Sequence, residues 1–456
     1  MGNSNRRKLF FYGTSIGALL FLFSEGVFAW QVYALPLGFV LFYFIYEYKF
    51  CRIKGISFSL AIIVLMYWFR LVLLPIMAYT GSEDSSVDYN LPIFLTLYEY
   101  VVVSVFVFFV NFNHYKIKEK HHIYLCGSIK IYILYGVLAF IVYMLFARDL
   151  NLFDFFLKAS NTTERSGDIV DFKALIIREI INCGMLFFYL VLVQKWQRKY
   201  TQNNRNSSLY CVLFISLLFL SIISGERRTA ILYRAFAIVV ILIQLFPTQK
   251  WKILKTIALG SFLVLTLMTI YKSFYAYMYD SYIAALKDRD IVDALGGQVF
   301  DAYFYGIRTI AMNLDFIKTV ELSFTNMLYD FLRSIFGLHL LMKDNGFTTT
   351  QLYNLSIYGM GQTNGYLFAA ISYGYAYFGL LLAPLIPLFN VVVMIGLERL
   401  MNRFVSVEMV YIFALIFIRF AFGFESEPMS LINLSTRMFV IYGIFYGVSR
   451  LMKGFK

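Results

Sequence analysis

Charged residues are scarce in this chain, and their scarcity excludes an ordinary soluble protein. Asp, Glu, Lys and Arg together make up 15% of the 456 residues, whereas about a quarter is usual in soluble domains. Hydrophobic residues make up 60% of the chain and aromatic residues 20%. The composition therefore predicts an integral membrane protein that crosses the bilayer several times.

Cysteine is also rare, and no nucleotide or zinc motif is present. The four cysteines (Cys51, Cys126, Cys183 and Cys211) share no short spacing and lie in or beside apolar runs, so we predict neither a disulfide framework nor a metal site. Walker A, GxGxxG and HExxH strings are absent from the sequence. An enzyme of this kind must therefore use a donor that is already activated, and we expect no cofactor and no metal.

Long apolar runs dominate the sequence. A membrane-spanning helix needs about 20 mostly apolar residues. Twelve runs are predicted as spans, at about 9–23, 27–46, 56–79, 91–111, 123–147, 174–194, 209–225, 230–247, 256–276, 373–397, 407–424 and 431–449. The expected fold is all-α, a single polytopic membrane domain over residues 1–456.

The positions of the basic residues predict the orientation. The segments expected in the cytoplasm are 1–8, 47–55, 112–122, 195–208, 248–255, 398–406 and 450–456, and they hold 21 of the 40 Lys and Arg. The short loops expected outside, 24–26, 80–90 and 425–430, hold none. Both termini are therefore predicted inside. Because the positive charge lies in these loops, the net charge of +13 does not indicate nucleic-acid binding.

One large segment, residues 277–372, is predicted outside the membrane. Within it, apolar residues from Phe300 to Ile317 follow helical spacing, with Asp301, Arg308 and Asp315 on the opposite face. We expect an amphipathic helix there, lying on or between the spans.

Arginines cluster near the outer ends of the predicted spans. Arg178, Arg227, Arg228, Arg234, Arg419 and Arg437 fall within about two helical turns of the outer surface. A cation at the bilayer centre costs at least about 2.5–3.5 kcal/mol, so such residues face a cavity, a partner or the headgroups. Guanidinium groups bind phosphate oxygens bidentately. The set therefore predicts a phosphate or pyrophosphate site, although pairing with Glu179 or Glu226 stays open for individual arginines.

Candidate sugar contacts and candidate bases lie in the same outer region. The stretch 344–366 interleaves amides, hydroxyls and aromatic rings, which suit a glycan as well as a solvated loop. Its candidate glycan contacts are Tyr353, Asn354, Tyr358, Gln362 and Asn364. Candidate catalytic bases are His339, Glu226 and Asp301, with Glu425 and Glu427 as further possibilities.

Three features give the chain a family resemblance. They are the turn SGERRTA (224–230) between two spans, the large outer segment in the second half, and TNGYLFAAISYGYAYFGLLLAPL (363–385). Together they resemble the Wzy-type polymerases of oligosaccharide repeat units in O-antigen and capsule assembly. The resemblance implies pyrophosphate contacts at Arg227, Arg228 and Arg308. The paired Arg-x10-Gly motifs of one subgroup are absent.

The resemblance also implies a reaction, a location and partners. The non-reducing-end hydroxyl of one undecaprenyl-pyrophosphate-linked oligosaccharide would attack the anomeric carbon of another, and lipid pyrophosphate would leave. The expected location is the cytoplasmic membrane of a bacterium. Expected partners are membrane lipid, a flippase and a chain-length regulator.

Three other functions fit the same features in part. An O-antigen ligase would use the same donor with a different acceptor. A flippase for lipid-linked glycans would require basic residues along a central path, whereas Lys130 is the only basic residue predicted in the inner half of a span. A polyprenyl-phosphate-sugar glycosyltransferase would carry acids in its first large outer loop, as in GSEDSSVDY (81–89).

Overall fold

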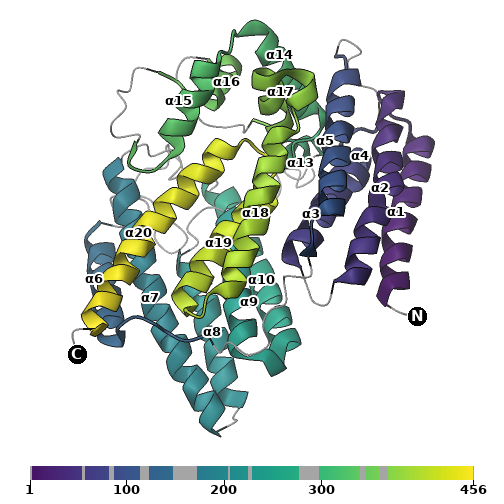
Figure 1. Cartoon of the computed structure of the whole chain (residues 1–456). Helices are drawn as coiled ribbons and strands as arrows, with labels where there is room; N and C mark the ends of the chain where they lie inside the picture. The colour runs from purple at the N-terminus through teal and green to yellow at the C-terminus, as the bar shows by residue number, and fades with distance from the viewer. Residues whose placement is uncertain are drawn as a thin grey trace. The chain divides into compact units, whose positions relative to one another are not determined.

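In the part of the chain that it describes, the computed structural model has helices as its regular secondary structure (Figure 1). It describes residues 3–53, 57–81, 87–112, 123–146, 172–203, 206–223, 228–276, 297–338, 346–359 and 368–454. Within these ranges, extended segments pair only through three isolated bridges. The all-α prediction is confirmed for these residues.

The helices form two compact units, and each unit combines segments that lie far apart in the sequence. Unit 1 comprises residues 1–117, 290–398 and 419–434, and unit 2 comprises residues 118–289, 399–418 and 435–456. Three helices contribute residues to both units: α18 (Leu385–Arg403), α19 (Val407–Gly423) and α20 (Pro428–Gly454).

Unit 1 contains the N-terminal helices and the described part of the 277–372 segment. Its further elements are α1 (Asn3–Glu25), η1 (Trp30–Tyr33), α2 (Ala34–Arg52), α3 (Phe58–Trp68), η2 (Phe69–Leu73), α4 (Leu74–Ala78), α5 (Asn90–Phe109), α13 (Gly297–Tyr303), α14 (Ile307–Thr319), α15 (Phe324–Ser334), α16 (Thr349–Tyr358) and α17 (Ala370–Leu382). Helix α2 packs between α1 and α5, and α14 contacts α5, α16 and α17. The 277–372 segment is therefore part of the packed unit through these helices.

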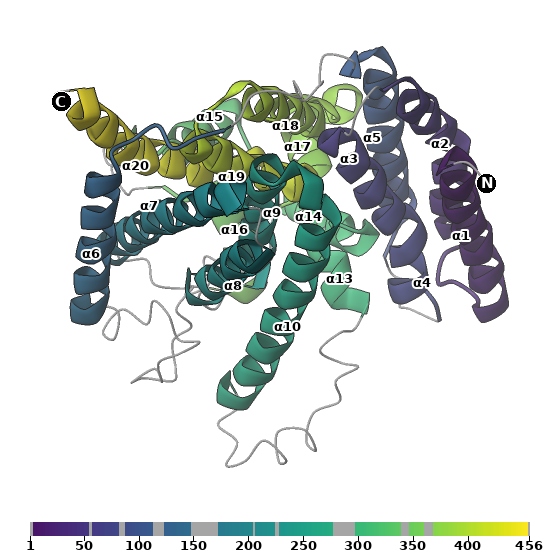
Figure 2. The ribbon, with the colours of Figure 1, turned by 90° about the horizontal axis from the view of Figure 1, so that it is seen from below.

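Unit 2 is a series of antiparallel helices that pack on their neighbours in sequence. Its further elements are α6 (Ile129–Phe146), α7 (Phe172–Asn203), α8 (Asn206–Ile223), α9 (Arg228–Leu245), η4 (Pro247–Gln249) and α10 (Lys250–Ala276). Helix α7 packs against both α6 and α8, and α10 packs against both α8 and α9 (Figure 2).

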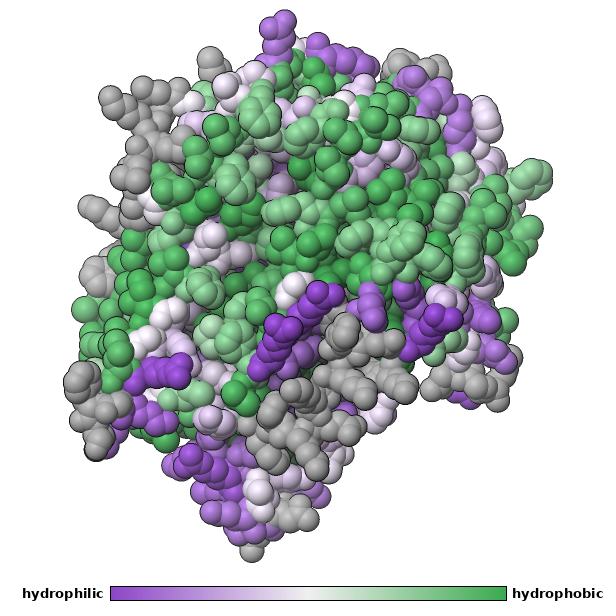
Figure 3. Space-filling view, in the orientation of Figure 1, coloured by the Kyte–Doolittle hydropathy of each residue, from purple (hydrophilic) through white to green (hydrophobic). Residues whose placement is uncertain are grey.

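Several of these helices could cross a membrane. Among the described residues, six are long and apolar enough: Trp30–Arg52, Phe58–Ala78, Asn90–Phe109, Ile176–Asn203, Leu385–Arg403 and Pro428–Lys453. Four shorter apolar helices cover 129–145, 206–222, 230–245 and 370–382. Hydrophobic side chains cover much of the surface in view in Figure 3. These features fit a helical membrane protein; twelve spans and an N-in, C-in orientation stay predictions.

Two predicted spans and the predicted amphipathic helix are interrupted. The 56–79 run contains η2, a π-helical turn, between α3 and α4. The 373–397 run, predicted as one helix, is two helices, and Gly379 adopts a φ of 71° that favours glycine. The helix predicted over 300–317 is likewise divided into α13 and α14, because Tyr305 has a φ of 49°. These breaks bring backbone groups and polar side chains together inside unit 1.

Buried carboxylates fix where several helices begin. Glu398 accepts hydrogen bonds from the backbone amides of Phe58 (2.6 Å) and Ser59 (3.1 Å) at the N-terminus of α3. In unit 2, Glu408 accepts from the amides of Cys126 and Gly127, each at 2.9 Å. A carboxylate at free backbone N–H groups satisfies donors that would otherwise be buried without partners.

The orientation can be tested with one introduced cysteine. Lys318, whose side chain is 72% exposed, lies in the segment predicted outside, whereas the exposed native Cys51 lies in a segment predicted inside. A membrane-impermeant maleimide should label Lys318→Cys in intact cells. The wild-type protein is the matched control and should react only after permeabilisation. Labelling of the wild type in intact cells would overturn the orientation.

Candidate functional site

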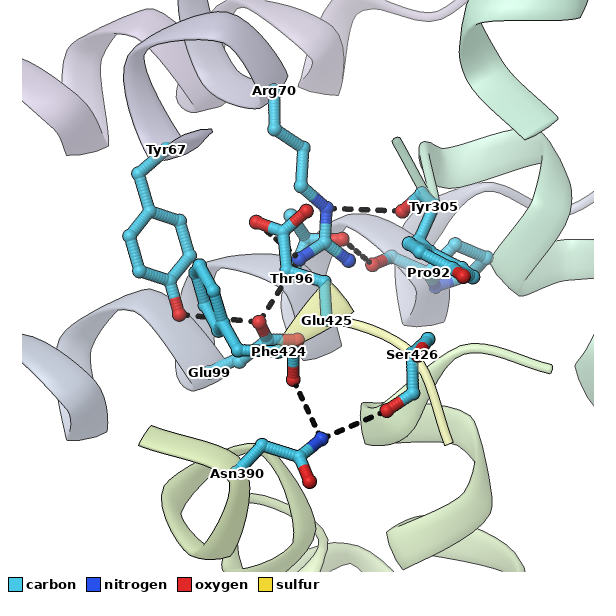
Figure 4. A network of polar contacts seen from close by, with 10 residues as sticks. All are labelled: Tyr67, Arg70, Pro92, Thr96, Glu99, Tyr305, Asn390, Phe424, Glu425 and Ser426. Atoms are coloured by element: carbon cyan, nitrogen blue, oxygen red, sulfur yellow. Dashed lines mark hydrogen bonds and ion pairs between the residues drawn. The ribbon is translucent and has the colours of Figure 1, made fainter. Parts of the chain in front are cut away.

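A buried arginine, Arg70, lies inside unit 1. Arg70 belongs to the π-helical turn η2, a type of irregularity that is frequent at functional sites. Its side chain is only 1% exposed. The Nε atom donates to the carbonyl of Tyr305 at 2.9 Å, and Nη1 donates to Glu99 Oε1 at 3.0 Å (Figure 4). A second carboxylate, Glu425 Oε1, lies 3.4 Å from the same Nη1.

Each member of this group comes from a different part of unit 1. Glu99 lies on α5, where it also accepts a hydrogen bond from the Tyr67 hydroxyl at 3.1 Å. Glu425 lies in the turn between α19 and α20. We call Arg70, Glu99 and Glu425 the Arg70 cluster. It ties the N-terminal helices to the C-terminal part of the same unit.

The turn that carries Glu425 is held at several points. The Asn390 side chain on α18 donates to the carbonyls of Phe424 and Ser426, each at 2.9 Å. The Glu425 carbonyl accepts from the Ala370 amide at 2.8 Å, and the Glu427 amide donates to the Phe368 carbonyl at 2.9 Å. The backbone on both sides of Glu425 is therefore fixed.

A second polar group lies among α15, α16, α17 and the same turn. Asp330 on α15 accepts from the Thr349 amide (3.0 Å), from the Thr349 hydroxyl (2.6 Å) and from the Tyr373 hydroxyl (2.9 Å). Thr350, the next residue on α16, donates to Glu427. We call Asp330, Thr349, Thr350, Tyr373 and Glu427 the acid–hydroxyl cluster.

Burial changes the acidity of the two carboxyl groups in this cluster. The pKa of Glu427 is raised to about 8, mainly by burial; the hydrogen bond from Thr350 opposes the increase and the nearby Asp330 adds to it. Burial also raises the pKa of Asp330, against its hydrogen bonds with Thr349 and Tyr373. A carboxyl group with a pKa of about 8 gains and loses its proton near neutral pH, which suits general acid–base catalysis.

Asp301, predicted as a catalytic base, holds the turn between α13 and α14. One carboxylate oxygen accepts from the Tyr79 hydroxyl at 2.5 Å, and the other accepts from the amide and hydroxyl of Thr309, each at 2.8 Å. A Cβ atom on Gly306 would lie 2.0 Å from Asp301 Oδ1, so a larger residue there would have to displace the Asp301 carboxylate. These contacts give Asp301 a positioning role at the start of α14.

The predicted phosphate-binding arginines are divided between the units. In unit 1, the half-buried Arg308 lies over the rings of Phe28 and Tyr79, at 5.5 and 5.9 Å. Arg419 is also in unit 1 and half-buried.

In unit 2, Arg437 Nη2 pairs with Glu179 Oε1 at 3.2 Å. Arg234 is 7% exposed and interacts electrostatically with Tyr411 and Tyr442. Arg437 therefore pairs with an acid inside the protein, which is the alternative to phosphate binding.

Tyr353 and Asn354 are core residues in this structure. Tyr353 is 1% exposed, and its ring makes edge contacts with Phe316 at 5.5 Å and Phe368 at 5.2 Å. Asn354 is fully buried and donates to the Thr350 carbonyl at 2.8 Å. Tyr353 therefore packs inward, and its ring presents no face for a sugar.

The other predicted site residues lie outside what the structure describes. His339, Glu226, Arg227, Gln362 and Asn364 fall outside the described ranges, and the side chains of Arg228 and Tyr358 are not described, although Arg228 begins α9 and Tyr358 ends α16. Their predicted roles stay predictions.

Sequence reasoning missed Arg70, Glu99 and Asp330. Arg70 and Glu99 each interrupt an apolar run of a predicted span, and charges of opposite sign within neighbouring spans often pair. That signal was available for these two residues. Asp330 has no comparable signal, because it follows an ordinary polar–apolar pattern in α15.

Among the described residues, no group of three or more His, Cys, Asp or Glu side chains could hold a metal ion. Comparisons of the chain with protein-family models, with curated proteins and with solved structures find no match. The functional argument therefore rests on the residues of the chain itself.

Proposed function

We propose that this chain polymerises lipid-linked oligosaccharide repeat units at the outer face of the cytoplasmic membrane. The observation that carries the proposal is the reversed polarity of α15. Its inward face holds Asp330 and Ser334, which are 1% and 5% exposed. Its outward face holds Phe324, Leu328 and Phe331, which are 64%, 49% and 41% exposed.

This reversal suits a substrate that is part lipid and part sugar. Phe324, Leu328 and Phe331 follow the i, i+4, i+7 spacing of a single helix face. An apolar face of this kind, on a helix outside the candidate spans, suits acyl or polyprenyl chains at the bilayer surface. The opposite face of the same helix carries Asp330 of the acid–hydroxyl cluster, and Asp330 lies close enough to Glu427 to affect its charge.

The proposed chemistry assigns one role to Glu427. An acceptor hydroxyl loses its proton to the Glu427 carboxylate while its oxygen forms a bond to the anomeric carbon of the donor. The bond from that carbon to the pyrophosphate oxygen breaks, and the lipid pyrophosphate leaves. Arginines that bind the leaving group, with Arg308 and Arg419 as the candidates in unit 1, would stabilise its developing charge.

A second candidate function is transport of a lipid-linked glycan. The Arg70 cluster favours it, since ionisable residues buried between membrane helices often mark substrate or ion pathways. The acid–hydroxyl cluster on an extramembrane helix favours the polymerase.

The polysaccharide profile of cells that lack this protein separates the two functions. Loss of a polymerase should leave surface material with single repeat units and remove all longer chains. Loss of a transporter should instead leave lipid-linked units on the cytoplasmic side. Expression of the wild-type chain from a plasmid is the control and should restore the full ladder.

Glu427→Gln tests the proposed base. The base is active when deprotonated, so wild-type polymerisation in isolated membranes should rise with pH up to about 8, where the raised pKa of Glu427 lies. Glu427→Gln keeps the shape and loses the base, and should slow polymerisation roughly 10²- to 10⁴-fold. The matched control is Glu321→Gln, an exposed acid of the same segment. Equal rates for the two variants would remove Glu427 from the mechanism.

Replacing the apolar face of α15 tests the lipid contact. Each half-exposed apolar side chain that packs on lipid contributes about 1 kcal/mol, so Phe324→Ser and Leu328→Ser should each raise KM for the lipid-linked substrate roughly five-fold. Met312→Ser on α14, which removes a side chain of similar exposure (42%), is the control. The same KM in all three variants, at equal membrane abundance, would contradict a lipid role for α15.

A further inference from the structure

The buried Arg70 cluster contains two carboxyl groups and one guanidinium group. Arg70, Glu99 and Glu425 are each no more than 1% exposed. An arginine stays protonated in proteins, so the cluster holds one positive charge against two carboxyl groups. A buried charge without a counter-charge is very costly, and such groups change their protonation state instead.

The hydrogen bonds show which carboxyl group is less well stabilised as an anion. Glu99 Oε1 accepts from both Arg70 Nη1 (3.0 Å) and the Tyr67 hydroxyl (3.1 Å). Neither oxygen of Glu425 accepts a hydrogen bond from the described residues, and its nearest cation is Nη1 at 3.4 Å. Hydrogen bonds to a carboxylate favour its ionised form.

We infer that the Arg70 cluster is a binding site for one proton, which is carried by Glu425. With that proton bound, the cluster is neutral: Arg70 pairs with Glu99, and Glu425 is a carboxylic acid. When the O–H bond of Glu425 breaks, the proton passes to solvent and two carboxylates share one guanidinium. The inference does not depend on the proposed function.

The groups around Glu425 support this assignment. Burial raises the pKa of Glu425 most strongly, Arg70 opposes the increase, and Glu99 adds to it. Tyr67, next to Glu99, also interacts with Glu425. Glu427, two residues further along, hydrogen bonds with Thr350 in the acid–hydroxyl cluster.

The position of Glu425 gives the proton a structural effect. Its carbonyl and the amide of Glu427 are hydrogen bonded to the Phe368–Ala370 segment. A change of charge at Glu425 therefore acts on the short turn that also places Glu427. Protonation of the Arg70 cluster and the position of the acid–hydroxyl cluster are coupled through this turn.

Infrared spectroscopy of the purified full-length protein tests the inference. A protonated carboxyl group has a C=O stretching band that is separate from the bands of carboxylates. We expect the wild-type protein at pH 6 to show one such band that Glu425→Gln lacks, and we expect it to disappear as pH rises. Glu321→Gln, an exposed control, should retain the band. No difference between the wild type and Glu425→Gln would overturn the inference.

Two further measurements keep the test decisive. Glu99→Gln leaves Arg70 with a single carboxylate, so Glu425 should ionise and the band should be lost; its persistence would contradict a shared arginine. The band should have the same intensity in sodium and potassium buffers, and its loss in sodium would mean that a metal cation takes the place of the proton.

The stability of the folded protein supplies an independent readout. A raised pKa in the folded state means that stability falls as pH rises from about 4.3, the ordinary value for Glu, to the raised value. For one proton, the ratio of folded to unfolded protein should fall about tenfold per pH unit in this window. Glu427, whose pKa is also raised, adds a slope of its own, so Glu425→Gln should reduce the total slope by one proton, and an unchanged slope would contradict the inference.

Discussion

The ion pair between Arg70 and Glu99 is the interaction on which the rest of unit 1 depends. A guanidinium between apolar helices is tolerated only with partners, and breaking a buried pair by removing one partner costs about 3–5 kcal/mol. Arg70 bonds Glu99 on α5 and the carbonyl of Tyr305, which lies between α13 and α14. The left-handed φ of Tyr305 is thus held by the same arginine, so the N-terminal helices and the 277–372 segment share one anchor.

Carboxylates have a wider structural role than ion pairing in this protein. Glu398 and Asp330 each accept backbone N–H groups at the first turn of a helix, α3 and α16 respectively, and Asp301 does the same at α14. The first turn of a helix in a membrane protein leaves backbone N–H donors that neither lipid nor apolar side chains can satisfy. Acids that look catalytic in a sequence can therefore be helix caps.

The sequence predicts the helical class and most helix positions, but it predicts the site poorly. Apolar runs predict helices because burial and lipid both require them, and 91–111 agrees closely with α5 (Asn90–Phe109). The π turn at Phe69–Leu73 and the break near Gly379 follow from tertiary contacts, which hydropathy does not report. The sequence predicts Asp301 as a candidate catalytic base, but its cap to Thr309 requires the turn at Gly306, which no pattern indicates. The sequence offers Glu425 and Glu427 together as possible bases, whereas their division between two clusters depends on the directions of their side chains.

The reversed polarity of α15 has a consequence for the order of folding. In water, an isolated helix with Phe324, Leu328 and Phe331 on one side would turn that side toward other apolar groups and leave Asp330 in solvent. The observed arrangement requires α16 and α17 to be in place, because Thr349 and Tyr373 supply the donors for Asp330. Helix α15 is synthesised before both. It therefore reaches its final position only after residues up to about 380 have been translocated or inserted, and until then a chaperone or the lipid surface must cover its apolar side.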